Sequence, residues 1–576
     1  MNLTNTQFVF ESKTKTVLIG GMILGAVCLA LSAWHDDQYL TRFWTNYLHN
    51  AVFFTGIAFM ATFFLAAQIV AFGGWNTAIK RVWEAMGQFL WVGIILLGVV
   101  VLGVWGHFHH LYLWNMPGIT DPSKSFYDKI ITGKSGFLNP MFYTFAVLIV
   151  PVIWYFWARN IRQASVDQDS QETATFDYYK RQRKWAASFL PLGGFLSTVF
   201  LWQSVMSVDP HWYSTMFAWY SMVSVWLASM SLTIMLIIYL KSKGYMEYVN
   251  RSHLHDIGKY LFGISVFWTY LWFDQFMLIW YANNGEETVY FNERMTYYPV
   301  LFWGNLLMNF VTPFFILMRN DTKRKFGTMF FVALIVFFGH WWDYFYMIKP
   351  GARITAHEIT EFSDPNYSKK KHHAAAPMGS ATSAAQEMET TTGGQSPMPT
   401  TPNVPGGRPV EQEGMGHREN NSQGGMPVVK RDSSLSTVDS AALAADTAAR
   451  TGVMTDRASA NSDENTAVAA TAGTEGAEAE GAKTEGEEME GAQMEGEHGE
   501  EQDENGWKSF KLGYTIPGLE ELGVMIGFLS LFLFFFFGQL AKSSLLPLRD
   551  PYLEESLHHD TGTLIETEVD EHDAHH

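Results

Sequence analysis

The chain has 576 residues, of which 48% are hydrophobic and 15% aromatic, and its formal net charge is -18. Its one cysteine, Cys28, excludes an iron–sulfur cluster or a covalently attached c-type haem held by this chain. The sequence has no glycine-rich phosphate loop and no cluster of oxygen ligands for a divalent metal. We therefore expect this chain to hold no cofactor and no metal, and to have no nucleic-acid partner.

Residues 1 to about 358 form a series of apolar runs, whereas the following segment is rich in Gly, Ala, Glu and Thr. Runs of about 20 apolar residues can cross a hydrocarbon core of ~30 Å, and only helices satisfy their backbone groups there. The sequence thus predicts an all-α polytopic membrane protein that spans the lipid bilayer about ten times. The predicted spans are Thr16–Ala33, Tyr47–Phe72, Gln88–Trp105, Phe137–Trp157, Ala186–Ser207, Met216–Leu240, Tyr260–Tyr281, Tyr297–Met318, Gly327–Met347 and Leu519–Leu540.

Four regions follow from this pattern: a nine-helix membrane domain (1–358), an acidic low-complexity insert (359–512), a final transmembrane helix (513–545) and an acidic, His-containing tail (546–576). The insert has too few apolar residues to fold alone, which predicts disorder. It is interpreted as a solvated tether, or alternatively as an acidic brush that attracts a basic soluble protein such as a cytochrome c.

Lys and Arg gather in the joints that follow even-numbered spans, as at Lys80 and Arg81. The joint with Lys124, Lys129 and Lys134 is the exception. By the positive-inside rule both termini are cytoplasmic and the insert lies outside the membrane. The first span is predicted to be retained, because the residues that follow it form a poor signal-peptide cleavage site.

Ionisable residues gather at the outer ends of several predicted spans. Asp209 and His211 lie in the short joint between the fifth and sixth spans, and Asp274 lies about two turns inside the seventh. His340 and Asp343 lie near the outer end of the ninth span. A carboxyl group at such depth costs at least ~2.5 kcal/mol unless it is paired, wetted or protonated, so these residues are candidates for proton transfer or for facing a quinol.

Three further candidates have plainer alternatives. His107 ends the third span, where histidines often serve only as interfacial residues. Asn305 and Asn309 lie one turn apart on the eighth span and belong either to a proton path or to helix–helix packing. The residues alone predict a proton-handling or quinone-facing membrane subunit without a metal centre.

The run Ser207–Tyr220, with its Asp-Pro-His-Trp sequence, resembles the signature of the polysulfide-reductase membrane-anchor (NrfD-like) family. The similar branch of that family supplies the two membrane subunits of alternative complex III, a bacterial quinol:cytochrome c oxidoreductase. The resemblance extends through Trp34–Tyr39, Phe273–Phe276 and Gly339–Asp343, and it covers 10–358 and the last span. It is closer to the ActF-type than to the ActC-type subunit.

This resemblance implies two four-helix bundles, formed by spans two to five and six to nine, with one flanking helix at each edge. It places the protein in the bacterial inner membrane, with the insert in the periplasm. The implied partners are a second NrfD-like membrane subunit, a multihaem cytochrome c, an iron–sulfur protein and a monohaem cytochrome c. The c-type haems and iron–sulfur clusters then belong to those partner subunits.

For this subunit the resemblance implies a role in stabilising the complex and in carrying protons. Asp209 and His211 match the family's Asp-Pro-His run. Asp274 matches its intramembrane acid, and His340 and Asp343 match its ninth-helix pair. We assign Asp274 and Asp343 to proton transfer, and His211 to accepting or relaying protons near the outer surface. Two alternatives stay open, namely a subunit that binds quinol directly and a purely structural anchor. An independent transporter is less favoured, because the spans are mostly unbroken apart from Pro191 and Pro313.

Overall fold

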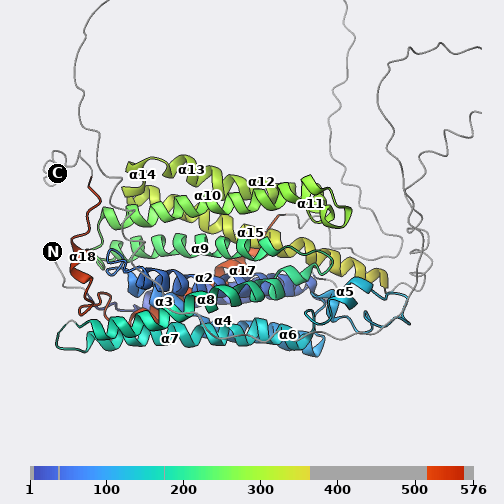
Figure 1. The fold of residues 1–576 in the computed structure, drawn as a ribbon, viewed down its shortest axis with the longest axis horizontal. Helices are drawn as coiled ribbons and strands as arrows, with labels where there is room; N and C mark the ends of the chain where they lie inside the picture. Colours follow the sequence, from blue (N-terminus) through green and yellow to red (C-terminus); the bar gives the residue numbers. More distant parts are fainter. Residues whose placement is uncertain (1–5, 35, 37–38, 174, 363–515, 563–576) are drawn as a thin grey trace, which may run out of the picture. The chain divides into compact units, whose positions relative to one another are not determined.

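Ten helices in the described part of the chain are long and apolar enough to cross a membrane, which confirms the predicted all-α polytopic fold (Figure 1). The computed structural model describes residues 6–34, 36, 39–173, 175–362 and 516–562. The predicted disordered insert lies almost entirely outside these residues. The spans consist of α1 (Ser12–Trp34), α2 (Thr41–Val70), α3 (Lys80–Gly87) with α4 (Leu90–Gly106), α6 (Pro140–Thr144) with a π-helical turn (Phe145–Ile149) and α7 (Val150–Asp169), α8 (Phe176–Ser204), α9 (Thr215–Ser242), α10 (Arg251–Ala282), α12 (Pro299–Leu306) with a π-helical turn (Leu307–Val311) and α13 (Thr312–Leu317), α15 (Phe326–Phe362) and α17 (Leu519–Leu540).

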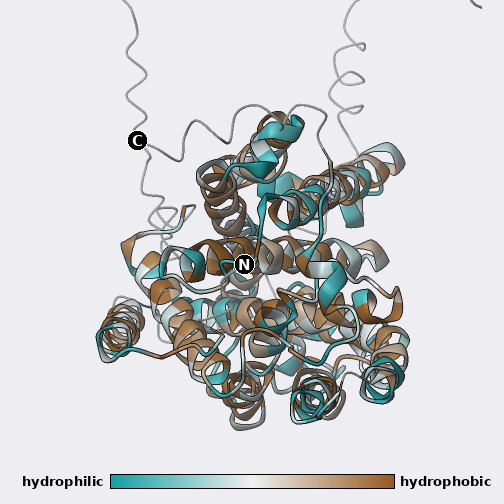
Figure 2. Ribbon diagram, turned by 90° about the vertical axis from the view of Figure 1, so that its left-hand side faces the viewer, coloured by the Kyte–Doolittle hydropathy of each residue, from teal (hydrophilic) through white to brown (hydrophobic). Residues whose placement is uncertain are grey.

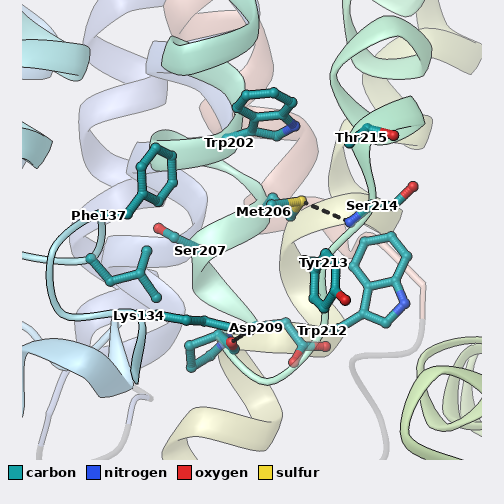
Figure 3. Close-up of a pocket in the computed structure, with 12 residues that line it drawn as sticks. Lys134, Phe137, Trp202, Met206, Ser207, Asp209, Trp212, Tyr213, Ser214 and Thr215 are labelled. Carbon is teal, nitrogen blue, oxygen red and sulfur yellow. Dashed lines mark hydrogen bonds between the residues drawn. The ribbon is translucent and has the colours of Figure 1, made fainter. Parts of the chain in front are cut away.

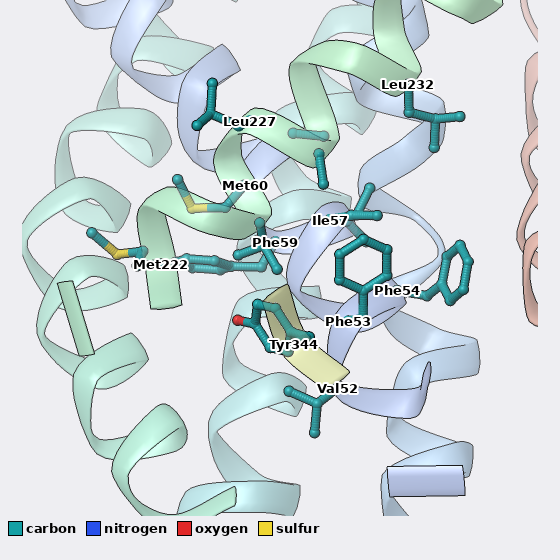
Figure 4. Packing of buried hydrophobic residues seen from close by; sticks show 14 of the residues in the cluster. Val52, Phe53, Phe54, Ile57, Phe59, Met60, Met222, Leu227, Leu232 and Tyr344 are labelled. Atoms are coloured by element: carbon teal, nitrogen blue, oxygen red, sulfur yellow. The ribbon is translucent and has the colours of Figure 1, made fainter. Parts of the chain in front are cut away.

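Eight of these spans form two groups of four. Helices α2, α4, α7 and α8 pack together as the first bundle, and α9, α10, α12–α13 and α15 pack together as the second. Helix α2 joins them by packing against α9 and α15. Figure 4 shows Phe53 and Ile57 of α2 in one buried apolar cluster with Met222 and Leu227 of α9. The bundle composition implied by the resemblance is therefore present.

The two flanking helices, α1 and α17, pack against each other, so the expectation of one helix at each edge is wrong. The physical reason is a close crossing of glycines. A Cβ added to Gly25 would lie 2.4 Å from the Cα of Gly527, and one added to Gly21 would lie 2.1 Å from the Ser530 hydroxyl. Small residues spaced four apart allow such close approach of helices in membranes.

We expect Gly25→Leu to separate α1 from α17, because its side chain has no room against Gly527. Overpacking of this kind typically costs about 1–3 kcal/mol. The rate at which a maleimide labels Cys28, the single cysteine of the chain, should rise. Gly20→Leu is the matched control, since nothing lies within 4 Å of a Cβ at Gly20. Equal labelling rates in the two variants would contradict the crossing.

Short helices mark the two ends of the bundles. Helices α5 (Lys129–Gly133) and α11 (Gly285–Tyr297) lie at one end, called here the α11 end, on the right in Figure 1. Helices α14 (Asn320–Arg324) and α18 (Leu553–Leu557) lie at the opposite, α18 end. Figure 2 looks at the molecule from that side and shows most spans end-on, with apolar residues prevalent along them.

The segment after α17 is held in place across the α18 end as far as it is described. The Leu545 amide donates to the Thr6 carbonyl at 2.6 Å, and His559 Nε2 lies 2.7 Å from the Asp256 carboxylate. The first part of the predicted tail is therefore ordered and bonded to the rest of the chain. Its residues 563–576 lie outside the described part of the chain.

Several helices extend beyond the predicted apolar runs at the α18 end. Helix α3 begins at Lys80 and α7 continues to Asp169, through residues that a hydropathy window counts as loop. These polar turns are stable because Arg81 pairs with Glu84 at 2.6 Å and also with Asp169. The buried charges satisfy one another and allow the helices to continue.

Candidate functional site

The Asp343 carboxylate is the centre of a buried polar cluster in the second bundle. Trp268 Nε1 and Ser224 Oγ donate to its Oδ2 at 3.1 and 2.8 Å. Asn305 Nδ2 donates to its Oδ1 at 3.0 Å, and the Tyr220 hydroxyl donates to the same oxygen. Each of the other three spans of the bundle thus contributes a donor to one carboxylate carried by α15.

Helical spacing explains how these groups meet. Tyr220 and Ser224 are four residues apart on α9, so both face α15. His340 precedes Asp343 by three residues, and its Nδ1 lies 3.0 Å from Ser224 Oγ. The π-helical turn that precedes Pro313 carries Asn309, whose side-chain amide donates to the Gly339 carbonyl at 3.0 Å.

The cluster is fully buried, and among the described residues no Lys or Arg lies within 4.0 Å of the Asp343 carboxylate. Asp343 and His340 are both fully buried. Among the described residues, the one basic group within 4.0 Å of the carboxylate is His340 Nδ1, at 4.0 Å. His340 Nε2 and Asn309 Oδ1 are buried without a hydrogen-bond partner in that part of the chain. Hydroxyl, imidazole and carboxyl groups in mutual contact can pass protons to one another.

A second cluster lies at the α11 end, in the joint before α9. His211 Nε2 lies 2.7 Å from Asp128 Oδ2, and His211 Nδ1 lies 3.8 Å from Glu358 Oε1. Asp128 also caps α5 by accepting from the Ile130 and Ile131 amides. The Lys134 ammonium donates to the Pro210 carbonyl at 2.6 Å, which fixes the joint from the other side.

Charge and burial shift the pKa values of this cluster. The hydrogen bond to Asp128 raises the pKa of His211 above its ordinary value, although burial opposes this shift. Burial would raise the pKa of Asp128, but the bonds from His211 and two backbone amides lower it to about 2. Burial raises the pKa of Asp209, and the nearby Arg294, His211 and Lys134 partly oppose that rise.

We expect the His211–Asp128 pair to stabilise the joint most between about pH 4 and pH 6.5. Because the folded pKa of His211 is raised, its contribution is complete below the ordinary pKa of 6.5 and is lost as pH rises through the folded value. Because the pKa of Asp128 is lowered, its contribution is present above 3.8 and is lost as pH falls through about 2. Thermal unfolding measured from pH 6 to 8 checks this.

The matched variants are Asp128→Asn and Asp121→Asn, the latter at a fully exposed acid of the same joint. Asp128→Asn should flatten the dependence of the melting temperature on pH between 6 and 8, whereas Asp121→Asn should leave it unchanged. The same slope in both variants would show that the pair does not stabilise the joint.

A pocket of about 210 Å³ lies beside this joint (Figure 3). Asp209 and Lys134 lie at one side of it, with Trp212 and Tyr213 from the joint, and Trp202 lies above them in the view. Its surface is formed mainly by apolar and aromatic groups. A pocket with apolar and aromatic walls is typical of sites for small molecules.

Six of the predicted site residues lie in the two clusters, and the other two lie elsewhere. His340, Asp343, Asn305 and Asn309 meet in the Asp343 cluster, and Asp209 and His211 lie together at the α11 end. Asp274 is half-buried on α10 and makes no hydrogen bond or ion pair to another described residue, and its proton-transfer role stays a prediction. His107 is exposed at the end of α4, with the Asn115 amide 3.4 Å from its Nδ1.

The sequence does not identify Tyr220, Ser224 and Trp268 as site residues, nor Asp128. A signal for the first two was present, since Tyr220 and Ser224 have the same four-residue spacing that drew attention to Asn305 and Asn309. Trp268 resembles the many other tryptophans of the spans. Asp128 lies far from His211 in sequence, within a joint that no periodicity describes.

Comparison with protein-family models and with curated proteins finds no match to this chain.

Proposed function

We propose that this protein is the proton-carrying membrane subunit of a bacterial quinol:cytochrome c oxidoreductase of the alternative complex III type. The observation that carries the proposal is the Asp343 carboxylate, which is buried in the second bundle and accepts hydrogen bonds from three other spans. A carboxylate inside a membrane is costly and usually functional. Protons would pass between this cluster and the Asp209–His211 joint at the α11 end.

The resemblance to the NrfD-like family supplies the redox half of the proposal. The proposed partners are a second NrfD-like membrane subunit, an iron–sulfur protein, a multihaem cytochrome c and a monohaem cytochrome c. In the proposed orientation the α18 end faces the cytoplasm, because the basic residues gather there, and the α11 end and the insert face the periplasm. Electrons would then travel through the partners while this chain handles protons.

Direct binding of quinol is the second candidate function. It is favoured by the pocket beside Asp209, which combines aromatic walls with a carboxylate and a lysine at its edge. A quinol head group needs an apolar slot and a proton acceptor, and both residue types are present there. In this alternative Asp209 takes the proton from quinol itself.

Purification of the tagged chain from its native membrane, in mild detergent, tests the proposal. We expect c-type haem in the reduced-minus-oxidised spectrum, an iron–sulfur protein among the co-purifying subunits, and quinol:cytochrome c activity. A haem-free chain that purifies alone would overturn the assignment to such a complex. The quinol alternative predicts in addition that Asp209→Asn raises the KM for quinol, whereas a proton path alone predicts a lower kcat at unchanged KM.

A further inference from the structure

Helix α11 is fastened to the Asp209 joint by a stack of three side chains. The rings of Trp212 and Tyr290 lie parallel, with centroids 3.7 Å apart and an interplanar angle of 11°. The Arg294 guanidinium lies 3.3 Å from the centroid of the same Tyr290 ring. Cation–π and aromatic stacking of this kind fixes the position of a guanidinium.

The guanidinium is buried and has unused donors. Arg294 is fully buried, and its Nη1 donates to the Tyr290 carbonyl at 3.0 Å. Its Nε and Nη2 have no hydrogen-bond partner among the described residues, and no carboxylate of that part of the chain lies within 4.0 Å of it. A buried charge with unpaired donors is costly unless nearby groups interact with it electrostatically.

Asp209 and Tyr346 are among the groups that interact electrostatically with Arg294. Asp209 is a half-buried acid whose Cβ lies 3.3 Å from a Cβ added to Gly351 of α15. The Tyr346 ring lies 5.8 Å from the guanidinium, and the Tyr346 hydroxyl is buried without a partner among the residues described. Tyr346 follows Asp343 by three residues on α15, so both lie on one face of that helix.

We propose that Arg294 is a positioning residue whose fixed charge acts, without direct contact, on Asp209 as the terminal proton acceptor of the route from Asp343. The stack on Tyr290 and Trp212 fixes the position of the charge beside the joint that carries Asp209. This inference rests on the proposed proton role of the chain. The charged and titratable groups that face Asp209 are Arg294 and Glu293 of α11, Lys134 and His211 of the joints, and Asp128, Tyr290 and Glu358 beside them.

The electrostatics agree with this geometry. Burial raises the pKa of Asp209, and Arg294 is the largest of the charges that lower it again. Without Arg294, Asp209 would bind its proton more tightly and release it at higher pH. The fixed guanidinium therefore lowers the proton affinity of Asp209.

Infrared titration of the purified protein tests the coupling without turnover. The carboxyl C=O band of Asp209 is identified by its loss in Asp209→Asn and is followed as a function of pH. In Arg294→Gln the band should persist to higher pH by about one unit or more. Arg294→Lys should titrate near the wild type, because the charge is kept. Arg251→Gln, an exposed arginine at the α18 end, should not shift the band.

An unshifted Asp209 band in folded Arg294→Gln, or an equal shift in Arg294→Lys, overturns the proposal. If Arg294→Gln does not fold, Arg294→Met carries the same expectation, since its flexible apolar side chain suits a buried site.

In the complete complex with Arg294→Gln, the acidic limb of the pH profile of turnover should move to higher pH, as the Asp209 band does. A shifted band with an unmoved profile overturns the role of Asp209 as acceptor. Wild-type protein without quinol:cytochrome c activity overturns the proposed function and leaves the measured coupling standing.

Discussion

Replacing Asp343 by asparagine is expected to abolish proton-coupled turnover and to lower the free energy of unfolding by about 2 kcal/mol. The carboxylate accepts two donors on each oxygen, whereas an asparagine side chain has one acceptor oxygen. Its NH2 group would face either the Trp268 and Ser224 donors or the Tyr220 and Asn305 donors. A buried donor that loses its acceptor costs about 1–3 kcal/mol.

Unfolding in detergent mixtures and quinol:cytochrome c turnover measure the two effects. Asp321→Asn is the matched control, because Asp321 is an exposed acid on the short helix α14, outside the spans. An Asp343→Asn variant as stable and as active as that control would mean that neither the fold nor the reaction uses this carboxylate.

Arg42→Ala should detach α17 from α2, with a loss of about 3–5 kcal/mol. Arg42 Nε and Nη2 bind the two oxygens of Glu521 at 2.7 and 2.9 Å, and Nη1 lies 2.5 Å from Glu520. Arg42 and Glu521 are 4% and 2% exposed, so removing the guanidinium leaves a buried carboxylate that has lost its forked partner. Cys28 lies beside Gly523 of α17. Faster maleimide labelling of Cys28 and an earlier unfolding transition would both report the loss.

Two control variants distinguish loss of the buried Arg42–Glu521 pair from loss of a positive charge in general. Arg42→Lys keeps the charge but lacks the fork, so it should lose an intermediate amount of stability. Lys180→Ala removes an exposed pair with Asp177, whose side chains are 68% and 84% exposed, and should change stability by less than about 1 kcal/mol. If Arg42→Ala resembled Lys180→Ala, the buried pair would not hold α17.

The spans were predictable because their apolar cores are long enough to be recognised from hydropathy. The last one, Leu519–Leu540, has the same bounds in the structure as in the prediction. The pairing of α1 with α17 was not predictable in the same way. Glycines spaced four apart are visible in both helices, at Gly21 and Gly25 and at Gly523 and Gly527, but spacing does not name the partner.

For the site residues, depth in the membrane could be predicted from the sequence, but the direction in which each side chain faces could not. Asp274 and Asp343 are both intramembrane acids predicted near the same ends of their helices, and depth can be read from position in a span. The rotation of a helix about its own axis cannot be read from the sequence, because packing against neighbouring helices sets it. Asp343 faces three other spans, whereas Asp274 lies beside Tyr270 and Met277, which are 58% and 39% exposed. Trp268, not Asp274, is the α10 residue that contacts the cluster.

The proton route through Asp343 is tested by measuring proton release by the purified complex in lipid vesicles. Tyr220→Phe removes one hydroxyl from the Asp343 carboxylate, and Tyr344→Phe removes an equally buried hydroxyl that donates to the Ser221 carbonyl at 3.0 Å instead. We expect Tyr220→Phe to slow proton release at least about tenfold and Tyr344→Phe to leave it near the wild-type rate. Equal rates of release in both variants and the wild type would contradict a proton route through Asp343.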